Sequence, residues 1–137
     1  MKSYMLDTCI SSFIMHELPY EVLKRLEHEV EQGNRIVISA VTYAEKRYGQ
    51  IGKKASPKIS KLIDAFVQRL DGILAWDATA VDRTILIRSQ LAKVGTPIGN
   101  NDAAIAAHAI TSQSILVTNN TREFSRIKDL EYEDWVH

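Results

Sequence analysis

Apolar residues recur along the chain in two alternating patterns, short continuous runs and longer stretches with helical spacing. The short runs predict strands at residues 4–6, 36–38, 73–76, 114–118 and 130–133. The stretches between them predict helices at 11–15, 19–32, 41–48, 57–70, 78–94 and 102–109. This alternation is typical of an α/β domain whose central, largely parallel sheet of 4–5 strands is flanked by helices.

Capping residues support several of these helix ends. Ser56 and Pro57 form an N-cap and first-turn pair, and Asp77 is a second N-cap candidate. Gly33 and Gly95 follow helical stretches directly, where glycine commonly ends a helix. Because no repeat, linker or low-complexity tract separates the elements, we expect one domain over residues 1–137.

Length and composition change this picture little. The chain has 137 residues, of which 45% are hydrophobic, enough for one core without a disulfide or metal to hold it together. The single cysteine, Cys9, fits a reducing, cytoplasmic compartment, and we find no signal peptide or membrane-spanning run. We therefore expect a soluble protein in which any metal serves chemistry.

Net charge does not by itself predict binding to nucleic acid, because 17 basic residues balance 17 acidic ones. The distribution is uneven, since residues 46–61 contain no acid. The basic residues of this stretch are Lys46, Arg47, Lys53, Lys54, Lys58 and Lys61. Members of this run, together with Arg122, are candidates for contacts with an RNA backbone, although ordinary solvated surface charge explains them equally well.

Acidic side chains follow the predicted strands at positions that the fold would bring together. Asp7 ends the first strand, Glu45 lies in the helix after the second, and Asp102 opens the helix before the fourth. The polar residues after the fourth strand are Asn119, Asn120 and Glu123. Loops at the carboxyl ends of parallel strands gather at one edge of a sheet, so we expect these side chains to converge there.

Carboxylates gathered in this way raise one another's pKa unless a cation compensates them. Oxygen donors select hard ions such as Mg²⁺ or Mn²⁺, which can activate water and neutralise charge on a phosphate. Hydrolysis of a phosphodiester is therefore the natural reaction. Taken singly, each acid also has a structural explanation: a cap for Asp7, a solvated helix position for Glu45, and a helix-dipole interaction for Asp102.

Histidine gives little support for another kind of site. The four histidines show no pairing at metal-binding spacing. His108 lies six residues beyond Asp102 and so faces a different side of the helix. We expect His108 to be a packing or hydrogen-bonding residue.

The sequence around these acids resembles PIN-domain proteins, and more narrowly the VapC-type toxin ribonucleases of toxin–antitoxin pairs. The resemblance rests on four segments in the right order and spacing. They are MLDT at 5–8, ISAVTYAE at 38–45 followed by YG, PIGNND at 97–102 followed by IAAHA at 105–109, and VTNNTREF at 117–124. Together these segments extend over nearly the whole chain.

The resemblance implies that Asp7 and Asp102 are the principal metal ligands and that Glu45 is a third acidic member. It also implies a contribution from the last segment, through either Asn120 or Glu123. The residues expected to orient the ligands or the attacking water are Thr8, Thr118 and Asn119. A cognate small antitoxin, a homodimer, and cleavage of structured RNA such as the anticodon stem-loop of initiator tRNA are implied as well.

Cys9 is the one departure from the family pattern, because the family usually carries an asparagine at this position that helps to hold the site. No partner for a nucleophilic cysteine is visible, so a small buried apolar residue is the preferred interpretation. The departure leaves open a PIN domain without catalytic activity that only binds antitoxin or RNA.

Two other classes share part of this chemistry. An aspartyl-phosphate phosphatase needs a second aspartate two residues after Asp7, where Cys9 stands. A receiver-like phosphoacceptor domain needs an acidic pair after the first strand and a lysine after a late strand, and neither is clear. We therefore expect an endoribonuclease dependent on Mg²⁺ or Mn²⁺, with the inactive PIN domain and the receiver-like domain as alternatives.

Overall fold

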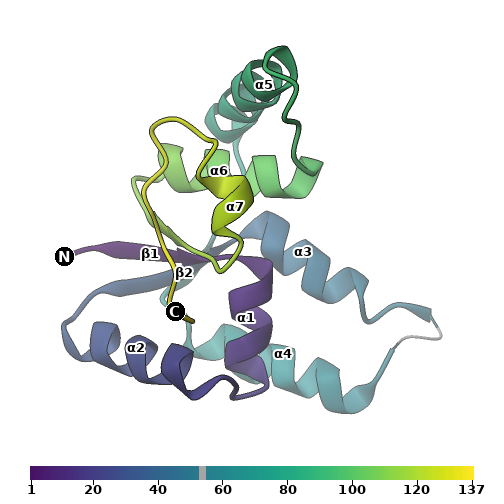
Figure 1. Cartoon of the computed structure of the whole chain (residues 1–137). Helices are drawn as coiled ribbons and strands as arrows, with labels where there is room; N and C mark the ends of the chain where they lie inside the picture. The colour runs from purple at the N-terminus through teal and green to yellow at the C-terminus, as the bar shows by residue number, and fades with distance from the viewer. Residues whose placement is uncertain (53–54) are drawn as a thin grey trace.

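The computed structural model describes residues 1–52 and 55–137, in which one sheet lies between layers of helices (Figure 1). The strands are β1 (Ser3–Leu6), β2 (Arg35–Ser39), β3 (Gly72–Leu74), β4 (Ile115–Val117) and β5 (Tyr132–Glu133). The helices are α1 (Thr8–Met15), α2 (Tyr20–Glu31), α3 (Ala40–Tyr48), α4 (Pro57–Arg69), α5 (Ala78–Lys93), α6 (Asn100–Thr111) and α7 (Thr121–Phe124). Within the described residues, no helix combines the length and the apolar character needed to cross a membrane.

The strands of the sheet follow the order β3-β2-β1-β4-β5, and every neighbouring pair is parallel. Successive residues of a strand face opposite sides. Tyr4 and Leu6 therefore belong to one buried core, and Met5 belongs to the other. Because both faces are covered, the strands appear in the sequence as continuous apolar runs. The predicted parallel α/β architecture is confirmed.

Helix α6 packs on one face of the sheet through small side chains. Its alanines at positions 103, 106, 107 and 109 are fully buried and join a core with Met5 and Leu116. Ile87 and Leu91 of α5 close this core from outside. The small side chains let the α6 backbone approach the strands, which holds the first turn of α6 close to the carboxyl end of β1.

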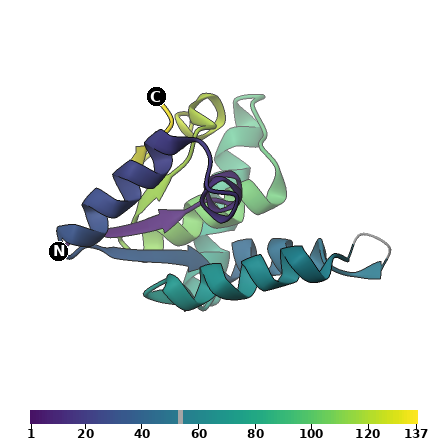
Figure 2. The ribbon, with the colours of Figure 1, turned by 90° about the horizontal axis from the view of Figure 1, so that it is seen from below.

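Helices α1, α2 and α4 cover the opposite face. Seen from below, α2 and α4 lie on either side of α1 (Figure 2). Ile10 of α1, Val22 of α2 and Ile63 of α4 are buried in a second core that includes Leu6 and Ile38. This layer fixes α1 at the end of β1.

Three differences from the predicted elements lie near the carboxyl edge of the sheet. Helix α1 begins at Thr8, earlier than expected, because the Asp7 side chain caps it. Helix α6 begins at Asn100, so Asp102 lies within its first turn instead of opening it. The short helix α7 is absent from the prediction, because four residues carry no detectable hydrophobic period.

A charged cluster fixes the C-terminal segment to α2 and β1. Arg25 donates hydrogen bonds to Glu29 at 2.8 Å and to Glu133 at 2.7 Å, and its guanidinium lies 5.5 Å from the ring centroid of Trp135. The Trp135 indole donates to Glu133 at 3.1 Å and packs on Tyr4 with 5.3 Å between ring centroids. These contacts hold β5 against β4, the strand that leads to α7.

Because the buried face of α6 leaves no room for larger side chains, we expect Ala106→Leu to lower the free energy of unfolding by about 2 kcal/mol, as overpacking typically does. Ala92 on α5 is exposed and provides the matched control. Ala92→Leu should change the free energy by less than about 0.5 kcal/mol. Urea unfolding followed by circular dichroism measures both values, and equal losses would contradict the close packing of α6.

Candidate active site

Four acidic side chains, Asp7, Glu45, Asp102 and Glu123, lie around the carboxyl edge of the sheet, which we call the acidic edge. Asp7 directly follows β1, and Glu45 lies in α3 after β2. Asp102 lies in the first turn of α6, and Glu123 lies in α7 after β4. The charges of Asp7, Glu45 and Glu123 all act on Asp102. The structure thus brings together acids that are up to 116 positions apart in the sequence, from 7 to 123.

Asp7 is the most enclosed of these acids, with 5% of its surface exposed. Its Oδ1 accepts a hydrogen bond from the Ile10 N–H at 2.8 Å, which caps α1, and Thr118 also hydrogen-bonds to the side chain. Burial raises the pKa of Asp7, while these hydrogen bonds and the charge of Lys46 act in the opposite direction. Asp7 therefore caps a helix and also contributes a fixed carboxylate to the acidic edge.

Glu45 is held in place by Thr8. The Thr8 hydroxyl donates to Glu45 Oε1 at 2.7 Å and so links the first turn of α1 to α3. Glu45 is half-buried and is not the plain solvated helix residue that its local sequence also allows. The contact is the kind that fixes the direction of a metal-binding carboxylate.

Asp102 and Glu123 form a close carboxyl pair. Partial burial, a hydrogen bond to Glu123 and the neighbouring negative charges raise the pKa of Asp102 to about 6. Asn120 Nδ2 donates to Glu123 Oε2 at 2.8 Å, and the Asn120 N–H donates to Thr118 Oγ1 at 3.0 Å. Glu123 therefore lies against Asp102, and Asn120 supports Glu123. The sequence left open which of Asn120 and Glu123 contributes to the site.

One positive side chain, Lys46, lies beside these acids. It is half-buried on α3 next to Glu45, and its ammonium group donates to the hydroxyl of Ser12 on α1. Its charge acts on Asp7, Glu45 and Cys9. The sequence placed Lys46 only in a basic run, and nothing in the sequence indicated Ser12. The position of Lys46 directly after Glu45 was the one sequence feature that could have indicated it. The direction of the Lys46 side chain, however, depends on how α1 and α3 pack.

The structure places three other predicted residues away from this arrangement or at its margin. Cys9 is exposed and not buried as expected, because the early start of α1 turns this position outward. Arg47 points toward α4, where it pairs with Asp64 at 2.6 Å and lies over the ring of Tyr43. Arg122 is exposed on α7.

Lys53 and Lys54 lie outside the described residues. Asn119 is half-buried before α7, and in the described part of the chain no side-chain hydrogen bond joins it to the acids. His108 is buried, with Nδ1 2.7 Å from the hydroxyl of Ser39, and burial lowers its pKa. The prediction that His108 is a packing or hydrogen-bonding residue is confirmed.

The donor set fits a hard divalent cation. Asp7, Glu45, Asp102 and Glu123 supply only carboxylate oxygens, and the pKa of Asp102 is raised by burial and by the neighbouring negative charges, which a cation would offset. Over residues 1–52 and 55–137, no three acidic, histidine or cysteine side chains already form a closed set of ligands. Mg²⁺ does not require such a cage, since it commonly binds one or two carboxylates and keeps several waters.

Comparison with known proteins identifies the family. The PIN domain model matches residues 4–130. The chain belongs to the PIN domain family. This PIN domain is 41% identical over 135 residues to the tRNA(fMet)-specific endonuclease VapC of Shigella flexneri, in a match covering 98% of this chain and 99% of the relative. It is 37% identical over 132 residues to Ribonuclease VapC2 of Rickettsia felis, covering 96% of this chain and 97% of the relative.

Solved structures support the same assignment. The crystal structure of DNA-bound VapBC from Salmonella typhimurium matches this PIN domain with a TM-score of 0.87 and 36% identity, covering 98% of this chain and 99% of the other. VapBC2 from Rickettsia felis, bound to a promoter DNA fragment, matches with a TM-score of 0.86 and 36% identity, covering 97% and 98%. The family inferred from the four sequence segments is therefore confirmed.

The pKa of Asp102 makes stability depend on pH. The pKa is about 6 in the folded protein and ordinarily 3.8, so between these values the folded state retains a proton that the unfolded state has lost. The stability of the metal-free protein therefore falls as pH rises through this window. We expect Asp102→Asn to raise the free energy of unfolding near pH 7.5 by about 1 kcal/mol, with allowance for partial exposure, and to change it little near pH 4.

Thermal unfolding in the presence of a chelator measures this effect. Asp82→Asn is the matched control, because Asp82 is exposed on α5. It should leave the dependence on pH unchanged. An Asp102→Asn variant that is no more stable than the natural protein near pH 7.5 would show that burial and the neighbouring acids do not disfavour the charged form of Asp102 as described.

Proposed function

We propose that this PIN domain is the toxin of a toxin–antitoxin pair and a divalent-metal-dependent endoribonuclease that cleaves tRNA. The observation that carries the proposal is the arrangement of Asp7, Asp102 and Glu123 around one edge of the sheet. The similarity to the tRNA(fMet)-specific endonuclease of Shigella flexneri supports the substrate class. Mg²⁺ or Mn²⁺ is the proposed ion, and the anticodon stem-loop of initiator tRNA, a cytoplasmic molecule, is the proposed target.

The side chains of the acidic edge have distinct roles in this proposal. A bound cation would supply charge that neutralises the phosphate and would lower the pKa of a water molecule. Asp7, Asp102 and Glu45 would hold it, with Glu123 beside Asp102. Asp7 keeps one orientation because Ile10 and Thr118 hydrogen-bond to it.

Loss of the Asp102 proton sets the pH above which this side chain can offer a charged carboxylate to a cation. Below about pH 6, Asp102 retains its proton and the negative charge of the pair is reduced. Above this pH, Asp102 ionises beside Glu123, and Asn120 still orients the Glu123 carboxylate through its amide. Asp102 therefore contributes its negative charge to the proposed site at neutral pH.

We expect purified protein to cleave initiator tRNA with Mg²⁺ or Mn²⁺ and to stop when the ion is chelated. Asp7→Asn should reduce cleavage by about a hundredfold or more, since loss of a ligand costs at least as much as loss of the groups that support ligands. Asparagine can still cap α1, so the fold should persist. Gel analysis of labelled tRNA measures the rate, with Asp82→Asn as the control.

Expression in bacteria without an antitoxin provides a second measurement. The natural chain should arrest growth, and Asp7→Asn should not. Cleavage that persists in a chelator and in Asp7→Asn would refute the metal mechanism. A folded natural chain that neither cleaves RNA nor arrests growth would favour the inactive PIN domain instead.

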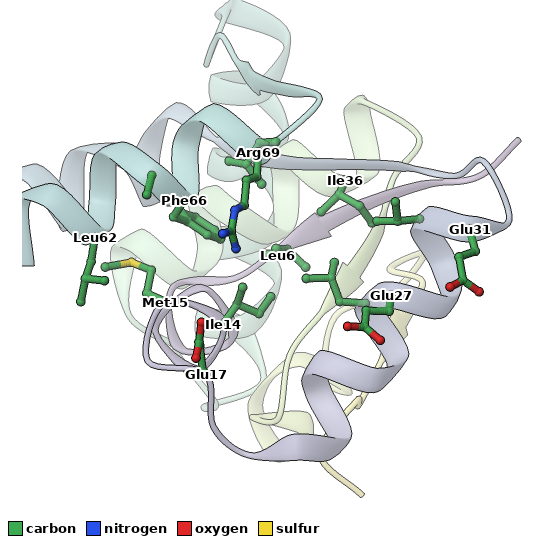
Figure 3. Close-up of a pocket in the computed structure, with 14 residues that line it drawn as sticks. Leu6, Ile14, Met15, Glu17, Glu27, Glu31, Ile36, Leu62, Phe66 and Arg69 are labelled. Carbon is green, nitrogen blue, oxygen red and sulfur yellow. The ribbon is translucent and has the colours of Figure 1, made fainter.

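An apolar groove between α1, α2 and α4 offers a surface for the antitoxin (Figure 3). It has a volume of about 620 Å³ and includes Ile14, Leu62 and Phe66. Its charged lining residues are Glu17, Glu27 and Glu31, which are acidic, and Arg69, which is basic. We propose that an amphipathic antitoxin segment with basic side chains docks here. The excess of acidic over basic residues in the groove lining favours such a segment, and the similar Salmonella and Rickettsia structures are VapBC assemblies.

Val30 tests the groove without entering the core, because its side chain is 55% exposed on α2 and lines the groove. We expect Val30→Lys to weaken binding of the cognate antitoxin about tenfold or more and to leave tRNA cleavage unchanged, since it adds a positive charge to an apolar contact. Val94→Lys is the matched control, because Val94 is 70% exposed at the end of α5. Isothermal titration calorimetry with the antitoxin measures both, and equal affinities would refute the groove as the docking surface.

A further inference from the structure

Lys46 occupies an unusual position for a lysine. Lysine side chains usually extend into water, whereas Lys46 is half-buried and its ammonium group donates to the hydroxyl of Ser12. Ser12 lies on α1, and Lys46 lies on α3. The Lys46 side chain therefore links the two helices that follow β1 and β2.

The contact with Ser12 leaves part of the ammonium group available. An ammonium group has three N–H donors, and Ser12 accepts one of them. Over the described residues, no carboxylate lies within ion-pair distance of Lys46, although the charges of Asp7 and Glu45 act on it. Lys46 thus combines a fixed position, a positive charge and free donors.

The neighbouring basic residue differs in each of these respects. Arg47 pairs with Asp64 at 2.6 Å, and its guanidinium lies over the ring of Tyr43, 5.1 Å from the centroid. Both partners of Arg47 lie on the α3–α4 side, away from Ser12. Two adjacent basic residues are therefore separated by the structure, one directed toward the acids and one held against α4.

Charge is distributed unevenly over the acidic edge. The Lys46 charge acts on Asp7 and Glu45, whereas Asp102 faces Glu123, a second acid. A bound cation would offset most negative charge beside Asp102 and Glu123, because the groups that act on Asp102 within residues 1–52 and 55–137 are acids. On the other side, the ammonium group of Lys46 contributes positive charge beside Asp7 and Glu45.

We propose that Lys46 binds the phosphate that the site cleaves, with its ammonium group held in position by Ser12. The inference rests on the proposed ribonuclease function and adds a substrate-binding residue to it. Lysine is a suitable group for this role because its ammonium is a compact charge that attracts phosphate oxygens from any direction. The alternative is that Lys46 only offsets the charges of Asp7 and Glu45.

The dependence of RNA binding on salt separates these two roles. A side chain that neutralises a phosphate releases a counterion, and each such contact contributes about 0.7 to 0.9 to the slope of log affinity against log salt concentration. A lysine that only offsets neighbouring acids releases no counterion from RNA. Its loss leaves the slope unchanged.

The experiment measures binding of labelled initiator tRNA over a range of salt concentrations, with a chelator present. All proteins carry Asp102→Asn, which blocks cleavage under the proposed function and removes one charge that would repel the RNA. Lys46→Met is the test variant, Lys46→Arg retains the charge, and Arg47→Met is the matched control. Circular dichroism verifies that each protein is folded.

We expect Lys46→Met to weaken binding several-fold and to lower the slope by about 0.7 to 0.9. Lys46→Arg should retain most of the slope, and Arg47→Met should leave it unchanged. A slope that is the same with and without Lys46, or that falls equally in Arg47→Met, would overturn the inference. The two proposals can fail separately. If the natural chain binds tRNA but does not cleave it, the proposed function is refuted. A lower slope in Lys46→Met would still support the phosphate contact.

Discussion

Repulsion between carboxylates at one edge of a parallel sheet is the constraint on which this structure depends. Asp7, Glu45 and Glu123 are close enough to Asp102 for their charges, together with partial burial, to raise its pKa. Left to itself, a flexible chain would move such groups apart. The buried alanines of α6 and the cap that Asp7 provides to α1 keep them together, because both are part of the packed core. The acidic edge is thus maintained by burial of apolar surface elsewhere.

The order of the strands explains how distant residues share this edge. β1 lies in the centre of the sheet between β2 and β4, so the segments that leave these three strands emerge side by side. They carry Asp7, Glu45 and Glu123 respectively, and α6 adds Asp102 before the chain enters β4. Since all strands are parallel, their carboxyl ends coincide. The topology, more than any local preference, places the four acids around one edge.

Helix α1 takes part in both surfaces that the proposed function uses. Its first residue, Thr8, hydrogen-bonds to Glu45, and Ser12 accepts from Lys46. Its last turn provides Ile14 and Met15 to the apolar groove. Eight residues therefore connect the acidic edge to the groove through one rigid element. A partner bound in the groove would contact the same helix that orients the Glu45 carboxylate and the Lys46 ammonium group.

The sequence by itself determined the class of fold, most of the elements and the principal acids. Apolar runs and caps are local properties, so the strands and the helix that begins at Pro57 were predictable, as was the family from its four segments. The tertiary structure decided the rest. Whether Cys9 is buried, whether Glu123 or Asn120 contacts Asp102, and which of Lys46 and Arg47 faces the acids depend on the packing of elements distant in sequence. Side-chain direction at such junctions follows from the angle and depth at which helices meet the sheet, and hydrophobic periodicity carries no information about either.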